Sequence, residues 1–258
     1  MNSINARGAE LRRLHDAPEL LQVVNVWDAV SARVIGDLPD TRALATASHS
    51  IAATLGYEDG EKIPLDLMLD MVGRIVRATD LPVSADLEAG YGNAGETIRR
   101  AIGIGVVGAN LEDQLRPFDD AVASVRSAVA AATAEGVPFA LNARTDVFLR
   151  DTIPTDDEKI AEAIRRGRAF LDEGATCVFT PGRLDERTVE RLVGGLGERK
   201  LSVIAVPGSL SPSRLQELGV ARVSYGPWTQ RVALTALRDA ALTLYAGGAL
   251  PEGTQTLN

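Results

Sequence analysis

The sequence has one cysteine, Cys177, few aromatic residues (4%) and no long apolar run. A single cysteine excludes an internal disulfide framework and is typical of a reducing compartment. No stretch approaches the ~18 consecutive apolar residues that a membrane span needs. The segment Met1 to Asp16 carries charges throughout, so we do not expect a signal peptide there. These absences predict a cytoplasmic protein with no membrane partner.

Positive charge is also scarce. Lys and Arg together number 27 against 35 Asp and Glu, which gives a net charge of −8. This balance argues against nucleic acid or an anionic membrane surface as the main partner. The 258 residues are 45% hydrophobic, and one α/β barrel of this length is ordinary. The composition therefore favours a globular protein that acts on a small molecule.

Apolar runs alternate with helical patterns along the whole chain. We expect strands at Leu21–Trp27, Arg42–Ser48, from Leu81 onward, Gly108–Asp113, Pro138–Thr145, Thr176–Thr180, Leu201–Val206 and Val220–Tyr225. We expect helices at Ser3–His15, Asp28–Gly36, Pro64–Ala78, Glu96–Val106, Phe118–Glu135, Asp156–Glu173, Leu184–Val193, Pro212–Leu218 and Pro227–Ala246, and a loop at His49–Ile63. Eight such repeats predict a single (β/α)8 TIM barrel over residues 1–258, with an N-terminal helix and a C-terminal helical extension. An open, doubly wound sheet is the alternative, but polar groups at so many strand ends favour the barrel.

Two carboxylates stand two residues apart where the third strand turns into a Gly-x-Gly segment. Side chains i and i+2 of a strand share a face, so Asp86 and Glu88 are expected to project together. Like charges on one face repel unless a cation lies between them or one carboxyl holds a proton. Oxygen ligands suit a hard cation such as Mg²⁺ or Mn²⁺. A solvated pair at a loop entrance is the alternative.

The reactive face of such a barrel lies at the carboxyl ends of its strands. The first five predicted strands end in polar residues, whereas strands six to eight end in segments poor in charge. The polar ends are Trp27 with Asp28, Ser48 with His49, Asp86 with Glu88, Glu112 with Asp113, and Asn142 with Arg144 and Asp146. Convergence of acids and an arginine from separate strands favours a functional site over a chance arrangement.

Four blocks and one supporting segment resemble the isocitrate lyase/phosphoenolpyruvate mutase superfamily, in its order and spacing. They are Leu55–Asp59, Ala85–Asn93, Leu111–Gln114 and Asn142–Asp146, together with Asn25–Asp28. The resemblance implies a TIM-barrel enzyme that uses Mg²⁺, with Mn²⁺ as an alternative ion. Such enzymes cleave or rearrange a C–C or P–C bond beside a 2-oxo or 2-hydroxy carboxylate through a metal-stabilised pyruvate enolate. It also implies a homo-oligomer, a tetramer or a dimer, in which neighbouring subunits exchange a C-terminal helix.

The resemblance assigns roles by position. Asp86 is expected to bind the metal directly, and Glu88 and Glu112 directly or through water. Asp59 and Arg144 are the expected catalytic residues, with His49 as a candidate proton donor that has packing as its equal alternative. The planar fork of an arginine suits the anionic end of a carboxylate substrate. The expected substrate-binding residues are Trp27, Ser48, His49, Asn142 and Arg144.

One departure bears on the reaction. Lyases of the superfamily carry a Lys-Lys-Cys-Gly-His lid and the mutase a Lys-Thr-Asn-Ser run, whereas this chain continues as Leu115–Asp120 into a helix. Decarboxylation, retro-aldol cleavage and hydrolysis stay open, and so does phosphonomutase or phosphonopyruvate hydrolase chemistry. A non-catalytic, dicarboxylate-binding barrel is a further alternative. Elsewhere we expect a buried Cys177, a surface His15, and a solvated helix face at Arg165, Arg166 and Arg168.

Overall fold

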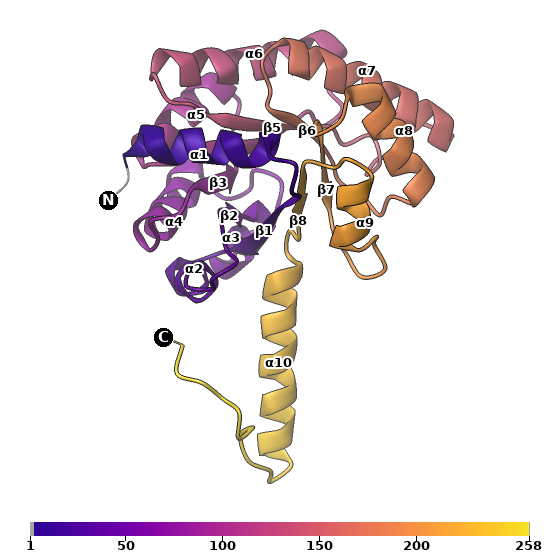
Figure 1. Cartoon of the computed structure of the whole chain (residues 1–258). Coiled ribbons are helices and arrows are strands. Elements are labelled where there is room, and N and C mark those ends of the chain that lie inside the picture. The colour runs from indigo at the N-terminus through magenta and orange to yellow at the C-terminus, as the bar shows by residue number, and fades with distance from the viewer. Residues whose placement is uncertain (1–2, 258) are drawn as a thin grey trace.

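Eight parallel strands close into a barrel, surrounded by helices (Figure 1). The computed structural model describes residues 3–257; residues 1, 2 and 258, which the predicted range 1–258 includes, lie outside it. Neighbours pair in sequence order from β1 to β8, and β8 pairs back with β1. The strands are β1 Leu21–Val26, β2 Leu44–Thr46, β3 Val83–Asp86, β4 Gly108–Glu112, β5 Ala140–Arg144, β6 Cys177–Thr180, β7 Leu201–Ile204 and β8 Arg222–Ser224. The barrel is confirmed, and the open doubly wound sheet is excluded.

The helices lie outside the barrel wall, and all but the last pack their apolar faces against it. They are α1 Ile4–Asp16, α2 Ala29–Gly36, α3 Ser48–Thr54, α4 Leu65–Arg77, α5 Ala94–Gly103, α6 Phe118–Ala134, α7 Asp156–Asp172, α8 Glu186–Leu196, α9 Pro212–Glu217 and α10 Trp228–Tyr245. The leading helix α1 packs against the start of β5. A Cβ on Gly8 of α1 would lie 2.3 Å from the carbonyl oxygen of Pro138, so this close approach requires glycine.

One predicted loop contains a helix. Residues 48–54 form α3, although His49–Ile63 was expected to be a loop. Seven residues are too few to display a helical period, and Ala47 at the N-cap forms no side-chain cap, so neither usual signal was present. Burial of Ile51 and Ala52 in the core holds this helix in place. The helix predicted at Leu184–Val193 begins and ends later, at Glu186–Leu196.

The barrel interior is unusually polar. Asn142 of β5 donates to Ser202 of β7, and Arg222 of β8 donates to Ser84 of β3. Neither pair of strands is adjacent, so both hydrogen bonds cross the interior. Barrel interiors are usually filled by branched apolar side chains. In this chain a polar layer lies in the middle of the barrel, one step below the residues at the carboxyl ends of the strands.

Two residues expected at the surface are buried. His15 of α1 is 1% exposed, and its Nδ1 donates to the carbonyl oxygen of Leu11 at 2.8 Å. Arg166 of α7 is 6% exposed and pairs with the buried Asp113, so it is not part of a solvated face. Both were misjudged because a charged residue on a helix is usually solvated unless it has a buried partner. Burial of Cys177 is confirmed, with no exposed surface.

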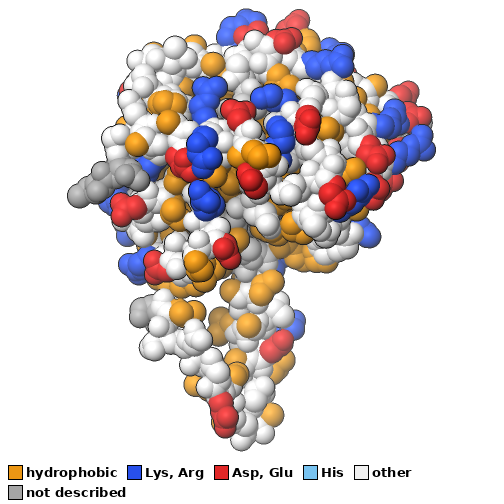
Figure 2. Space-filling model, in the orientation of Figure 1, with side chains coloured by type: hydrophobic (Ala, Val, Ile, Leu, Met, Phe, Trp, Pro, Cys, Tyr) orange, Lys and Arg blue, Asp and Glu red, His pale blue; other side chains and the backbone are white. Residues whose placement is uncertain are grey.

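The last helix projects away from the barrel. In Figure 1, α10 extends from the end of β8, and the chain after it runs back beside it. Large apolar side chains along α10 are exposed, and Figure 2 shows apolar groups over this projection; they include Val232, Leu234, Leu237, Leu242 and Leu244. Within residues 3–257, no helix is long and apolar enough to cross a membrane.

Candidate active site

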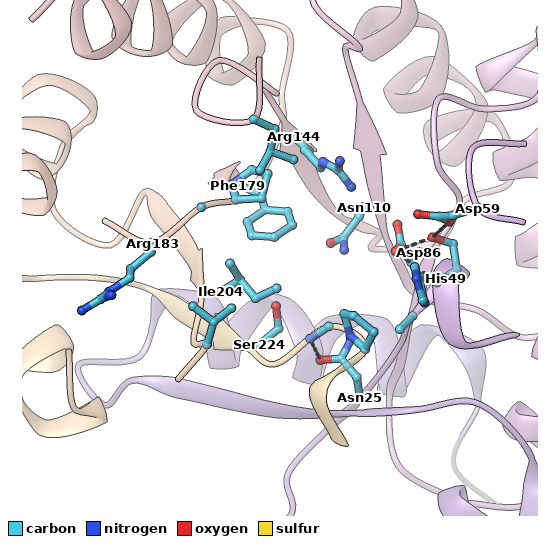
Figure 3. A pocket seen from close by; sticks show the side chains of 18 residues that line it. Asn25, His49, Asp59, Asp86, Asn110, Arg144, Phe179, Arg183, Ile204 and Ser224 are labelled. Carbon is cyan, nitrogen blue, oxygen red and sulfur yellow. Dashed lines mark hydrogen bonds between the residues drawn. The ribbon is translucent and has the colours of Figure 1, made fainter. Parts of the chain in front are cut away.

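A cavity of about 240 Å³ opens at the carboxyl ends of the strands (Figure 3). Its polar side comes from the first five strands and the loops that follow them. The apolar side comes mainly from β6, β7 and the segments after them. The main lining residues are Asn25, Ser48, His49, Asp59, Asp86, Asn110 and Arg144 on the polar side, and Phe179, Pro181, Ile204 and Val206 on the apolar side. A second hollow beside it is lined by Glu88, Glu112, Gln114 and Asp146.

Asp86 is the last residue of β3 and is held by the neighbouring strand. Its backbone N–H donates to the hydroxyl of Thr46 at 2.9 Å. Its Oδ2 accepts from the Ser48 hydroxyl at 2.9 Å and from the Ser48 backbone N–H at 3.2 Å. Its Oδ1 is buried, with no hydrogen-bond partner in the described part of the chain. The same hydroxyl lies 3.3 Å from Oδ1 of Asp59. Ser48 therefore links the two aspartates at the cavity wall.

Glu88 reaches the site from a turn rather than from the strand. β3 ends at Asp86, and Glu88 has a φ of +52°, in the left-handed region. The prediction that both carboxylates project from one strand face is therefore wrong in its mechanism, because the alternation stops at Asp86. Glu88 is nevertheless buried near Asp86, and its Oε2 accepts from the backbone N–H of Glu61. Its Oε1 has no hydrogen-bond partner within residues 3–257.

Backbone strain gathers in the two loops that carry these acids. Among the described residues other than glycine, six have a positive φ. Four of the six follow β3 or β4, namely Glu88, Tyr91, Gln114 and Leu115. Such conformations cost about 1–3 kcal/mol each and persist where the surrounding contacts impose them. These conformations reduce stability, so their concentration in the loops after β3 and β4 indicates that the two loops have a functional role.

Arg144 at the end of β5 lies between two carboxylates. Its Nη1 is 2.7 Å from Oε2 of Glu112, and its Nε donates to Oδ1 of Asp146 at 2.7 Å. Glu112 also accepts a longer hydrogen bond, 3.2 Å, from Gln114. The arginine lines both hollows, so its guanidinium borders the space available to a ligand.

Burial and mutual repulsion shift the acidity of the cluster. Burial raises the pKa of Glu88 to about 8, and the Asp86 and Asp59 charges add to this. Burial also raises the pKa of Glu112 to about 7 against the opposing charge of Arg144. The pKa of Asp86 is raised by burial as well. Burial and mutual repulsion thus disfavour the ionised form of these carboxyl groups. A bound cation would stabilise that ionised form.

A buried ion pair supports the loops of the site from behind. Oδ2 of Asp113 accepts from Nη1 of Arg166 at 3.1 Å. Oδ1 of the same carboxylate accepts from the backbone N–H groups of Leu115 and Asp146 at 2.9 and 3.1 Å. Asp113 thus ties the loop after β4 to the loop after β5 and points away from the cavity.

Most of the predicted site residues line the cavity or its neighbour, but Trp27 and Asn142 do not. The cavity or its neighbour is lined by Ser48, His49, Asp59, Asp86, Glu88, Glu112 and Arg144, and Nδ1 of His49 is buried without a partner. Trp27 instead lines an apolar groove between α2 and α10. Asn142 is fully buried below the cavity floor. Sequence reasoning missed Asn110, Phe179, Ile204 and Ser224. Asn110 had a local signal, because it lies two residues before Glu112 and therefore shares its strand face, whereas strands β6, β7 and β8 contained no predicted site residue from which to count.

The donors present fit a hard divalent cation. Within residues 3–257, no three His, Cys, Asp or Glu side chains stand close enough together to form a complete metal site. Mg²⁺ is usually bound through one or two carboxylates and keeps several waters, so it does not need such a cluster. The buried and unpartnered oxygens of Asp86 and Glu88 supply carboxylate ligands of this type.

Known proteins share both the sequence pattern and the fold. The family model described as phosphoenolpyruvate phosphomutase matches residues 11–245. A solved structure described as a putative phosphonomutase from Burkholderia cenocepacia J2315 is 40% identical, with a TM-score of 0.86 over 92% of this chain and 98% of that chain. A solved oxaloacetate acetylhydrolase in complex with oxalate is 26% identical, with a TM-score of 0.85 over 97% and 92%.

A curated relative extends the comparison to decarboxylation. The oxaloacetate decarboxylase of Paraburkholderia xenovorans (strain LB400) is 28% identical over 253 residues, which cover 92% of this chain and 82% of that protein. The family match spans nearly the whole barrel together with α10. This chain belongs to the phosphoenolpyruvate phosphomutase family.

Proposed function

We propose that the protein is a Mg²⁺-dependent enzyme that cleaves a carbon–carbon bond of a small 2-oxo or 2-hydroxy dicarboxylate, with the electron pair of that bond taken up as an enolate. Decarboxylation of an oxo acid leaves pyruvate as its enolate, whereas retro-aldol cleavage of a 2-hydroxy acid releases pyruvate as the ketone and leaves the other carboxylate fragment as the enolate. The observation that carries the proposal is the cavity of about 240 Å³, which is lined by Asp86 and Asp59 together with the guanidinium of Arg144. Relatives named for oxaloacetate decarboxylase and 2,3-dimethylmalate lyase support it.

Arg144 is the proposed clamp for a substrate carboxylate. Burial lowers the pKa of Arg144, but the Glu112, Asp146 and Asp86 carboxylates outweigh that effect and raise the pKa above its ordinary value. The group therefore carries a positive charge at any working pH. Its ion pairs with Glu112 and Asp146 fix the plane of the guanidinium, so little conformational entropy is lost when an anion binds.

The acidic residues are the proposed cation site. Asp86 would hold the ion directly, and Glu88 and Glu112 directly or through water. A bound divalent cation would supply the positive charge that stabilises an enolate oxygen as it develops. Ser48 holds Oδ2 of Asp86 by two hydrogen bonds, which leaves Oδ1 as the free ligand oxygen.

Asp59 and His49 are the proposed groups for proton handling. Both line the cavity, and Figure 3 shows them beside Asp86. Among the residues that the structure describes, His49 Nδ1 has no hydrogen-bond partner, so it is available to a ligand. Asp59 shares the Ser48 hydroxyl with Asp86 and is thereby held next to the reacting end of a bound acid.

Cleavage of a phosphorus–carbon bond is a second candidate. The 40% identity to the Burkholderia cenocepacia protein favours it, since that protein is described as a putative phosphonomutase. The same carboxylates and arginine would serve a phosphonate, because both substrates present an anionic group beside a carbonyl.

The direct test is pyruvate release from a small panel, with Mg²⁺ and with EDTA. The panel contains oxaloacetate, 2,3-dimethylmalate, 2-methylisocitrate and phosphonopyruvate. We expect EDTA-sensitive pyruvate from oxaloacetate or 2,3-dimethylmalate. Formation of phosphoenolpyruvate by rearrangement, or of pyruvate by hydrolysis, from phosphonopyruvate alone would establish the second candidate instead. No turnover of any member, with oxalate still bound, would favour a dicarboxylate-binding barrel.

We also propose a homo-oligomer, a dimer or a tetramer, that covers α10. Val232 and Leu237 of this helix are 70% and 65% exposed, and contiguous exposed apolar surface marks interaction sites. Light scattering of the purified chain tests this, and a monomer at micromolar concentration would contradict it. A cytoplasmic location belongs to the same proposal, because the free thiol of Cys177 is compatible with a reducing compartment.

A further inference from the structure

Asn110 is the one carboxamide of β4 that reaches the cavity. It lies two residues before Glu112 and lines the cavity beside Asp86 and Arg144. Figure 3 shows its amide group near the middle of the hollow, between the acidic wall and the arginine. A carboxamide in that place can present either its oxygen or its nitrogen to a ligand. Which of the two faces the cavity decides whether the site attracts or repels an anion there.

A hydrogen bond from below decides this orientation. Nδ2 of Asn142 donates to Oδ1 of Asn110 at 2.7 Å. Oδ1 of Asn110 is therefore turned toward the barrel interior, where it accepts this hydrogen bond. Among the side chains of residues 3–257, none accepts a hydrogen bond from Nδ2 of Asn110. Its two N–H groups are consequently left for a ligand in the cavity.

The orientation of Asn142 is fixed in turn by two partners. Its Oδ1 accepts from the thiol of Cys177, with 2.9 Å between sulfur and oxygen. Its Nδ2 donates a second hydrogen bond to the Ser202 hydroxyl at 3.3 Å. If Asn142 were flipped, its oxygen would face Asn110 and the amide of Asn110 would turn to donate inward. The thiol is the group that favours one orientation over the other, because it supplies a proton to Oδ1.

Two features keep that proton on the sulfur and directed at Asn142. Burial raises the pKa of the Cys177 thiol to about 12, so the group stays protonated. The charge with the largest effect on it is the guanidinium of Arg222, which is fully buried and has only donors to offer. A neighbouring cation attracts the lone pairs of the sulfur and leaves the S–H bond to point away from it.

We propose that Asn110 is a substrate-binding residue that donates its amide N–H groups to an anionic oxygen of the ligand, and that Asn142 and Cys177 are positioning residues which fix this polarity. The proposal rests on the proposed function, because Asn110 would contact a second oxygen of the same acid whose carboxylate Arg144 binds. It also gives a role to Asn142, which the sequence predicted to touch substrate and which acts instead through Asn110.

We call the hydrogen bonds from Cys177 through Asn142 to Asn110 the relay; it determines which ligands the site prefers. With its N–H groups facing the cavity, Asn110 donates to a carboxylate or enolate oxygen and disfavours a ligand that places a donor at the same point. A site built to hydrogen-bond one group discriminates strongly against an analogue that lacks it, because a buried polar group is then left unpaired. Oxamate, in which an amide replaces one carboxylate of oxalate, is the matching probe.

Three variants test the relay by oxalate binding, measured by calorimetry with Mg²⁺ present. Cys177→Ser keeps a hydroxyl donor at the same place, whereas Cys177→Ala removes it at almost the same size. We expect Cys177→Ser to bind oxalate within about twofold of the unaltered chain and Cys177→Ala about tenfold more weakly, the effect of one neutral hydrogen bond. Asn110→Asp turns the donor into a negative acceptor and should weaken oxalate binding by at least about a hundredfold.

Mn²⁺ affinity and thermal unfolding are the controls. Asn110→Asp should keep or increase Mn²⁺ affinity while it loses oxalate, which a damaged fold would not do. Cys177→Ala should raise the KM of a turned-over acid and change kcat less, since the contact is made to ground state and transition state alike. The unaltered chain should bind oxamate at least about tenfold more weakly than oxalate.

Three other outcomes would each overturn part of this inference. Equal oxalate affinity of the Ser and Ala variants of Cys177 would overturn the relay. Oxalate affinity of Asn110→Asp equal to that of the unaltered chain would overturn the role of Asn110. Failure of the unaltered chain to bind oxalate, together with no pyruvate release from the panel, would overturn the proposed function and this inference with it.

Discussion

Arg144 and Glu112 form an ion pair of 2.7 Å where β5 and β4 end side by side. One residue is the proposed clamp for the substrate and the other a proposed ligand of the metal. In this structure each satisfies the other, so a metal and a substrate would compete with this contact. The pair therefore couples the two halves of the site, since a cation that draws Glu112 away leaves Arg144 freer to bind an anion.

Replacement of the clamp by another cation should not preserve its function. Arg144→Lys keeps the charge but loses the planar fork that contacts Glu112 and Asp146. We expect the KM of the acid to rise by about tenfold to a hundredfold, the range of one or two charge-assisted hydrogen bonds. Steady-state kinetics on the best substrate of the panel measures this. An unchanged KM would remove Arg144 from substrate binding.

Loss of the proposed direct ligand should remove the metal without unfolding the barrel. Asp86→Asn keeps the shape of the side chain and lowers its charge, so we expect Mn²⁺ affinity to disappear in calorimetry. Turnover should fall by about a hundredfold or more, because a Lewis acid supplies several kcal/mol.

Asp70→Asn is the matched control for that experiment. Asp70 pairs with Arg74 on the exposed face of α4, and we expect no effect on Mn²⁺ affinity or turnover. Retention of Mn²⁺ binding by Asp86→Asn would disprove the metal assignment.

Adjacent arginines of α7 should differ in their effect on stability. Arg166→Met leaves the buried carboxylate of Asp113 without its cation, which costs about 3–5 kcal/mol in comparable proteins. Arg165 pairs with Glu162 at the surface, so Arg165→Met should cost less than about 1 kcal/mol. Chemical denaturation measures both values. Equal losses would mean that the Asp113 pair does not hold the loops together.

His15 should make the fold sensitive to acid. Burial, with the charge of Arg222 as the next cause, lowers the pKa of His15 to about 3 in the folded chain. The unfolded chain takes up a proton near pH 6.5, whereas the folded chain does not until about pH 3. Stability from this residue is therefore fully present above pH 6.5 and declines by about 1.4 kcal/mol per pH unit below it.

The comparison with His15→Leu isolates that term, because Glu88 and Glu112 titrate in the same range in both proteins. We expect the free energy of unfolding of the unaltered chain to fall more steeply than that of His15→Leu between pH 6.5 and pH 4. Parallel curves would show that His15 is not held neutral.

The barrel could be predicted from sequence because each repeat contains its own signal. Buried parallel strands appear as short apolar runs, and Gly136 and Gly174 follow the long helices α6 and α7. The strand ends then identify which side chains lie at the mouth, and Asp86, Glu112 and Arg144 all lie at such ends. These residues follow from one-dimensional spacing alone.

The rest depended on contacts between distant segments. His15 lies near the charges of Arg222 and Arg199, which are about two hundred residues away in sequence. Asn142 is close to the end of β5 but one layer too deep to touch a ligand, and depth along a strand depends on where the barrel closes. Trp27 follows β1 and turns outward toward α2 and α10. No local pattern carries such information.

Enolate formation is the central claim, and deuterium uptake by pyruvate tests it most directly. The chain is incubated with pyruvate in D₂O, with Mg²⁺ or with EDTA, and the methyl signal is followed by NMR. We predict Mg²⁺-dependent loss of the methyl protons with the unaltered chain and none with Asp86→Asn. Exchange no faster than in buffer alone, by a chain that binds Mg²⁺ and oxalate and releases pyruvate from oxaloacetate, would contradict the account.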